Sequence, residues 1–189
     1  VTVGRLAKIL LELQGQGAHD VNLVTATHYA PQVREAVRLA REAGLVVPVV
    51  YNTSGYELSG VIDALEGTVD VWLPDYKYAD AALARRLSAA RDYPQVALDA
   101  IGRMVAQVEA AGGRLVDEGG IMRRGVIVRH LVLPGQVRNS LYALDALWER
   151  FGNGIDISVM NQYTPQPRLL GAVLGDFPDL ARAVSDQEY

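Results

Sequence analysis

The strongest constraint on this chain is the regular alternation of short apolar segments with amphipathic ones. Apolar runs of the kind found in buried strands occupy residues 21–25, 45–51 and 69–73, so successive strands begin about 25 residues apart. This spacing is typical of βα units, whose strands lie parallel in one sheet or barrel. Two further strands are predicted at 126–133 and 155–160.

Helices are predicted before and between these strands, because apolar residues recur there at helical spacing. Tyr93-Pro94 is interpreted as a turn, and residues 112–120 as a polar connection. The first 165 residues then form one parallel β/α domain, and residues 166–189 a tail with a short helix at 177–184. The predicted helices span 3–14, a segment beginning near Pro31, 58–65, 79–90, 96–111 and 140–151.

Composition excludes several classes of function. The net charge of −4 argues against a nucleic-acid surface, and no apolar run reaches the roughly 18 residues of a membrane span. The absence of a secretory signal favours the cytoplasm. The 189 residues contain no cysteine, which excludes disulfides, thiolate metal ligands and a cysteine nucleophile among them. No phosphate-binding glycine motif occurs, and the three histidines lack ligand spacing, so no metal site is predicted.

Polar side chains gather at the predicted carboxyl ends of the strands. In parallel α/β folds these ends meet along one edge, where ligands bind. The set holds hydroxyl and amide groups, a carboxylate and several cations, which suits a zwitterionic ligand with a ribose-like diol. The candidate binding residues are Thr25, Thr27, His28, Asn52, Asp75, Lys77, Arg129, His130, Gln162 and Tyr163.

Each candidate also has a purely structural interpretation. His28 could cap the helix that follows it, and Asp75 could be a turn or cap residue. Arg129 and His130 are neighbours in a strand, so one faces the barrel interior and the other the helix layer. A buried arginine requires a partner or a ligand, and Asp75 and Glu57 are the candidate partners for an internal ion pair.

Several of these segments together resemble the radical S-adenosylmethionine family, in the branch similar to pyruvate formate-lyase activating enzyme. The resemblance extends from Leu6 to about Tyr189. Ala26, where the family has proline, is a small departure. The segments that carry the resemblance are Asn22-Leu-Val-Thr-Ala-Thr-His-Tyr29, Val50-Tyr-Asn-Thr-Ser-Gly-Tyr56, Leu73-Pro-Asp-Tyr-Lys-Tyr78, Val128-Arg-His-Leu-Val-Leu-Pro-Gly135 and Met160-Asn-Gln-Tyr-Thr-Pro165.

The resemblance implies a partial (β/α)6 barrel of the TIM type. It also implies a [4Fe–4S] cluster held by a CxxxCxxC motif, with S-adenosylmethionine on its open iron. Reductive cleavage of this cofactor would give a 5′-deoxyadenosyl radical that abstracts hydrogen from a substrate such as a partner protein. A flavodoxin- or ferredoxin-type protein would supply the electron. The chain would lack the first strand and the cluster loop, with Val1 falling shortly after the cysteine motif.

The same resemblance assigns roles to the first candidate residues. Thr25, Thr27 and His28 correspond to the loop that meets the methionine amino group of the cofactor. Asp75 and Lys77 correspond to the pair that contacts its ribose and carboxylate.

The later motifs extend these assignments. Arg129 and His130 correspond to the fifth barrel strand beside the cofactor, and Gln162 and Tyr163 to the end of the sixth strand, near adenine or substrate.

The missing cysteines are the decisive departure from the family, since a chain without thiolates cannot hold the cluster. We therefore expect these residues to be the barrel portion of a radical S-adenosylmethionine protein, inactive by themselves. One alternative is a barrel that binds S-adenosylmethionine or a nucleoside without turnover. Another is a lyase or aldolase that uses Lys77 as a Schiff-base nucleophile.

Overall fold

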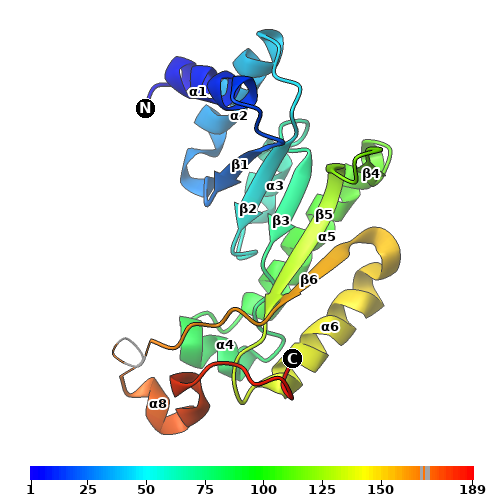
Figure 1. The fold of residues 1–189 in the computed structure, drawn as a ribbon. Helices are drawn as coiled ribbons and strands as arrows, with labels where there is room; N and C mark the ends of the chain where they lie inside the picture. The colour runs from blue at the N-terminus through cyan, green and yellow to red at the C-terminus, as the bar shows by residue number, and fades with distance from the viewer. Residues whose placement is uncertain (167, 169–170) are drawn as a thin grey trace.

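The computed structural model describes residues 1–166, 168 and 171–189 and contains one six-stranded, mostly parallel sheet (Figure 1). The strands lie in the order β1-β2-β3-β5, β6 pairs with the far side of β5, and β4 joins the first residues of β5. The strands are β1 (Val21–Val24), β2 (Val49–Thr53), β3 (Val71–Pro74), β4 (Leu115–Val116), β5 (Met122–Leu131) and β6 (Asp156–Met160).

The predicted α/β class is confirmed. The pairs β1·β2, β2·β3, β3·β5 and β5·β6 are all parallel, and only β4 runs antiparallel to its neighbour. Within the described residues β1 and β6 do not pair with each other, so the sheet is open and does not close into a barrel.

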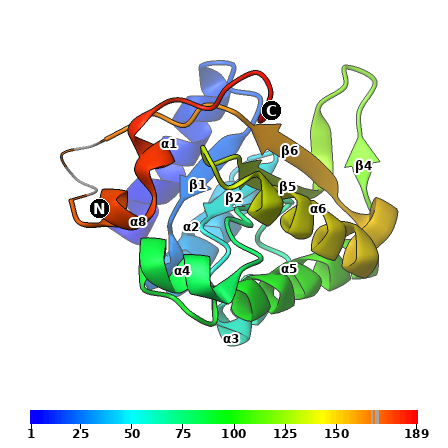
Figure 2. The ribbon, with the colours of Figure 1, turned by 90° about the horizontal axis from the view of Figure 1, so that it is seen from below.

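The helices that connect the strands cover one side of the sheet. Figure 2 shows α3 and α5 on the side of the strands opposite to the C-terminal segment. No helix in the described part of the chain combines the length and apolar character that crossing a bilayer requires. The helices are α1 (Val3–Gly15), α2 (Ala30–Glu42), α3 (Ser59–Ala64), α4 (Ala81–Ser88), α5 (Tyr93–Ala110), α6 (Val137–Phe151) and α8 (Val173–Asp176), with 3-10 turns η1 (Thr27–Tyr29), η2 (Gly152–Gly154) and η3 (Pro178–Ala181).

Strict alternation of buried and half-buried side chains explains which face of the sheet is covered. Along β3 and the segment after it, every second residue enters the core against the helices, while the residues between them are only half-buried on the open face. The alternation continues beyond the last strand residue, so the extended chain keeps its two faces as far as Tyr78. The buried residues are Trp72, Pro74, Tyr76 and Tyr78; the half-buried ones are Leu73, Asp75 and Lys77.

Several sequence predictions of secondary structure need correction. Tyr93-Pro94 is not a turn but the start of α5, because proline fits the first helical turn, where no N–H is required. The connection at 112–120 contains β4, whose two residues were too few to give a periodic signal, and β5 begins four residues earlier than predicted, at Met122. The tail helix predicted at 177–184 is wrong: that range contains only the 3-10 turn η3, and the short helix α8 ends before it.

The C-terminal segment is tied back onto the carboxyl ends of β5 and β6. The Glu188 carboxylate accepts a hydrogen bond from the Gly135 amide at 2.7 Å, just after β5. The Tyr163 hydroxyl donates to the Leu180 carbonyl at 2.8 Å, and the Leu180 side chain is buried. The predicted boundary at residue 166 stays a prediction, and residues 167 and 169–170 of the predicted tail lie outside the described part of the chain.

The end of β3 approaches the loop after β2 so closely that only glycine fits at position 55. Gly55 has φ +77°, and a Cβ built there would lie 2.1 Å from the Asp75 carbonyl oxygen. A positive φ is unfavourable for other residues, and here the obstacle is backbone that cannot rotate away. Gly55 therefore lets the ends of β2 and β3 lie side by side.

Replacing Gly55 with alanine is expected to destabilise the protein by more than about 2 kcal/mol, through backbone strain and overpacking. The matched control is Gly60→Ala in α3, where a Cβ meets nothing within 4 Å. That change removes a helix-interior glycine and should stabilise the protein by up to about 1 kcal/mol. Urea unfolding followed by circular dichroism measures the free energy of unfolding of the two variants. Equal stabilities of Gly55→Ala and Gly60→Ala would contradict the close approach of residue 55 to the Asp75 carbonyl.

Candidate functional site

A pocket opens at the carboxyl ends of β3, β5 and β6, on the face of the sheet that the helices leave uncovered. Its volume is about 350 Å³, within the range of small-molecule sites. We call it the rim pocket. Its lining residues are Asp75, Lys77, Tyr78, Arg129, Leu131, Leu133, Met160 and Gln162.

The register of β3 on β5 brings the central charges together. Val71 pairs with Gly125 and Trp72 with Val126, and the same offset places Asp75 directly opposite Arg129. Arg129 Nη2 lies 2.7 Å from Asp75 Oδ1. The internal ion pair between Arg129 and Asp75 is thereby confirmed.

Arg129 also reaches across β3 to β2. Its Nη2 donates to the Asn52 side-chain oxygen at 2.6 Å, so one guanidinium nitrogen serves both Asn52 and Asp75. Asp75 Oδ1 and Arg129 Nε are both buried without a hydrogen-bond partner among the described residues, although Oδ1 lies within the ion pair. Buried polar atoms normally have such partners, so the hydrogen-bonding capacity of this ion pair is not fully used.

Lys77 adds a second cation to the same face. Its Nζ lies 3.3 Å from Asp75 Oδ2, and its side chain is 42% exposed. Two cations therefore share one carboxylate, and the local charge favours an anionic group.

The opposite wall of the rim pocket is apolar. It is formed by Leu131, Leu133 and Met160, all half-buried. A ligand with a carboxylate at one end and an apolar or thioether portion at the other would match both walls.

The end of β1 lies beside the site but is engaged in its own contacts. Thr27 Oγ1 donates to Glu57 Oε1 at 2.6 Å, and the Glu57 side chain is buried. Thr25 has φ 51°, which is unusual for a β-branched residue, and its amide donates to the Asn52 carbonyl at 2.9 Å. His28 is exposed in the turn η1. None of Thr25, Thr27 and His28 is among the residues that line the rim pocket.

Of the two candidate binding residues after β6, only Gln162 lies at the rim pocket. Gln162 lines the rim pocket and is exposed. Tyr163 points its hydroxyl to the Leu180 carbonyl and so contributes to anchoring the C-terminal segment.

His130 lies on the other face of β5, as expected for the neighbour of Arg129. Its ring is fully buried; Nδ1 lies 2.6 Å from the Tyr76 carbonyl oxygen and Nε2 lies 2.9 Å from Ser140 Oγ. Because a carbonyl only accepts, Nδ1 carries the proton and, in the neutral ring, Nε2 accepts from Ser140. Burial lowers the pKa of His130 below its usual 6.5, while the bond to Tyr76 raises it to a smaller extent.

Two residues around the site, Tyr93 and Asn139, were not predicted from the sequence; both bind the backbone beside Asp75 and Lys77. Glu57, a candidate partner of the buried arginine, instead accepts from Thr27. The role of Tyr93 was not predicted because the sequence Tyr93-Pro94 is typical of a turn. Asn139 could have been noticed as a polar residue near the start of a helix that packs on the sheet. A side-chain amide buried at such a place requires hydrogen-bond partners.

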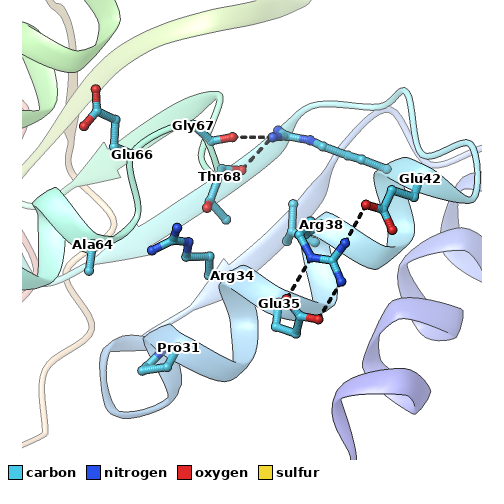
Figure 3. A pocket seen from close by; sticks show the side chains of 11 residues that line it. Pro31, Arg34, Glu35, Arg38, Glu42, Ala64, Glu66, Gly67 and Thr68 are labelled. Atoms are coloured by element: carbon cyan, nitrogen blue, oxygen red, sulfur yellow. Dashed lines mark hydrogen bonds and ion pairs between the residues drawn. The ribbon is translucent and has the colours of Figure 1, made fainter.

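A larger cavity of about 640 Å³ lies elsewhere, between α2 and the segment after α3 (Figure 3). Its charges are largely paired with one another. Arg38 binds both Glu35 and Glu42, as Figure 3 shows, and Arg41 binds the Gly67 carbonyl and Asp70. Among the described residues, no buried polar atom that lacks a hydrogen-bond partner belongs to this groove, whereas two belong to residues of the rim pocket.

The donor set does not fit a metal centre. No group of three or more histidine, cysteine, aspartate or glutamate side chains is placed to hold a metal ion within residues 1–166, 168 and 171–189. The sequence contains no cysteine, so these 189 residues do not fit a [4Fe–4S] cluster.

Comparison with known proteins gives a fold neighbour and one distant relative. No family model matches the chain. The uncharacterized protein MJ0674 of Methanocaldococcus jannaschii is 28% identical over 143 residues, which are 75% of this chain and 36% of that protein. The chain thus spans about a third of that relative's length. The crystal structure of SuiB from Streptococcus suis superposes with a TM-score of 0.57 at 14% identity, covering 97% of this chain and 42% of SuiB. This likeness shows a shared fold.

Acidification is expected to destabilise the fold through His130. The unfolded ring takes up a proton near 6.5, whereas the folded ring does so only at lower pH. The unfolded state therefore binds more protons as the pH falls below this value. The resulting contribution to stability is present above pH 6.5 and is lost as the pH falls through the lowered pKa of the folded state.

Urea unfolding from about pH 7 to about pH 5 tests this dependence. His130→Gln should make the free energy of unfolding less pH-dependent in this range than in the wild type. His28→Gln, a change at an exposed histidine, is the control and should leave the slope as it is. A wild-type slope retained in His130→Gln would show that other groups cause the dependence.

Proposed function

We propose that the rim pocket binds S-adenosylmethionine and that the chain is the barrel portion of a radical S-adenosylmethionine protein. The observation that carries this proposal is the unbalanced charge cluster in the rim pocket, where Lys77 and Arg129 share the single carboxylate of Asp75. The methionine part of S-adenosylmethionine carries a carboxylate, an ammonium and a sulfonium, and the ribose carries two hydroxyls. Lys77 and Arg129 would bind the carboxylate, and Asp75 would accept from the hydroxyls.

The shared fold supports the same proposal. SuiB, whose fold this chain resembles over nearly its whole length, is a radical S-adenosylmethionine enzyme. The open parallel sheet, with the pocket at its carboxyl ends, is compatible with an arc of a partial (β/α)6 barrel. In that arrangement the uncovered face of β3, β5 and β6 would be the barrel interior.

Only binding is assigned to these residues. Because the 189 residues contain no thiolate, they offer no ligands to the cluster that the family uses for cleavage. The chain's own contribution is to hold the methionine end of the cofactor at Lys77 and Arg129, and to place its apolar and thioether atoms against Leu131 and Met160.

The structure gives less support to a Schiff-base role for Lys77. A nucleophilic lysine is normally found desolvated in an apolar pocket or beside another cation. Lys77 instead lies beside the Asp75 carboxylate and is partly exposed.

Calorimetric titration with S-adenosylmethionine tests the proposal. Lys77→Met should weaken binding about tenfold to a hundredfold, the effect of losing a hydrogen bond to a charged group. Arg34→Met is the matched control, because it removes the same charge from the larger groove of Figure 3, away from the rim pocket.

Wild-type affinity in Arg34→Met together with weakened binding in Lys77→Met would support the proposal. Equal affinities in the two variants, weakening only in Arg34→Met, or no binding by the wild type would each overturn it.

A further inference from the structure

We propose that Tyr93, His130 and Asn139 are positioning residues that together fix the backbone of residues 75–80 and so set the geometry of Asp75 and Lys77. This segment follows β3 but is neither strand nor helix until α4 begins. Many of its backbone groups are nevertheless hydrogen-bonded, and three side chains from α5, β5 and α6 make most of these bonds. The inference deepens the proposed function and rests on it for the identity of the ligand.

Tyr93 contributes a single buried hydroxyl at the centre of the arrangement. Its oxygen accepts from the Lys77 amide at 2.9 Å and lies 2.9 Å from the Asp75 carbonyl oxygen and 2.8 Å from that of Ser54. Burial raises the pKa of Tyr93, so the hydroxyl keeps the hydrogen that one of these carbonyls accepts. The ring stacks on Tyr76 and meets Tyr78 edge-on, which holds the hydroxyl in place.

His130 holds the residue between the two charged ones. The Tyr76 amide donates to the Arg129 carbonyl at 2.8 Å, and the Tyr76 carbonyl accepts from His130 Nδ1. Ser140 on α6 fixes the other ring nitrogen. His130 thus acts on the rim pocket from the opposite face of β5, through the backbone of Tyr76.

Asn139 secures the end of the segment. Its Nδ2 donates to the Lys77 carbonyl at 3.1 Å, while its Oδ1 accepts from the amides of Ala79 at 2.9 Å and Asp80 at 3.2 Å. The side chain is 95% buried, so water does not replace these bonds easily.

The consequence is a preorganised site without regular secondary structure. Asp75 and Lys77 point to the open face, where the Asp75 carboxylate contacts both Lys77 and Arg129, while the amide and carbonyl groups between them are bound from the helix side. A ligand that meets side chains already held in position loses less conformational freedom on binding. Loosening this backbone should therefore weaken binding even though the charges remain.

Tyr93→Phe tests the inference most cleanly, because it removes one oxygen and keeps the stacked ring. Tyr56→Phe is the matched control: the Tyr56 ring also stacks on Tyr93, and its hydroxyl binds Asp92 instead of residues 75–80. Amide hydrogen exchange by NMR provides a local readout. The Lys77 amide should exchange about tenfold faster in Tyr93→Phe, the effect of one lost hydrogen bond, while the amides of β2 keep their protection.

The second readout is affinity for S-adenosylmethionine, which should fall by about fivefold or more in Tyr93→Phe and stay unchanged in Tyr56→Phe. An unaltered Lys77 amide in Tyr93→Phe would overturn the inference, as would faster exchange without any loss of affinity. If the wild type binds no S-adenosylmethionine, the proposed ligand is wrong. In that case the hydrogen-exchange rate of the Lys77 amide is the remaining test of whether Tyr93 positions residues 75–80.

Discussion

The parallel register of β3 on β5 is the constraint on which the site depends. It places Asp75 opposite Arg129 on the open face and, one residue along, places His130 in the helix layer, where it binds Tyr76. A shift of one residue would exchange the two faces and bury Arg129 against the apolar helices. The same pairing thus fixes both the charged pocket and the internal bonds behind it.

Close approach of backbone segments reinforces this register. Gly55 lets the loop after β2 lie against the Asp75 carbonyl, and Tyr93 then bridges the two segments through its hydroxyl. Gly55 and Tyr93 both contact the backbone of the short segment after β3. The chain therefore concentrates unusual features, a positive φ and a tyrosine cluster, where a binding site requires a fixed geometry.

Much of this could be predicted from sequence, and the limits have physical causes. Apolar runs at regular spacing predicted the α/β class and most strands, and the opposite orientations of Arg129 and His130 followed from strand geometry. The pairing of Arg129 with Asp75 was one of two options, because sequence does not fix register; Glu57 binds Thr27 instead. The contacts of Tyr93 and Asn139 form only after the helices pack, so the sequence did not identify their partners, although the position of Asn139 beside a predicted helix start was visible.

The most direct test of the central claim is a crystal structure of this chain with S-adenosylmethionine. The account predicts the methionine carboxylate in the rim pocket, within hydrogen-bond distance of Lys77 Nζ and the Arg129 guanidinium, with the backbone of residues 75–80 unchanged. Ligand bound in the groove beside α2, or a rim pocket that stays empty at saturating ligand, would contradict it.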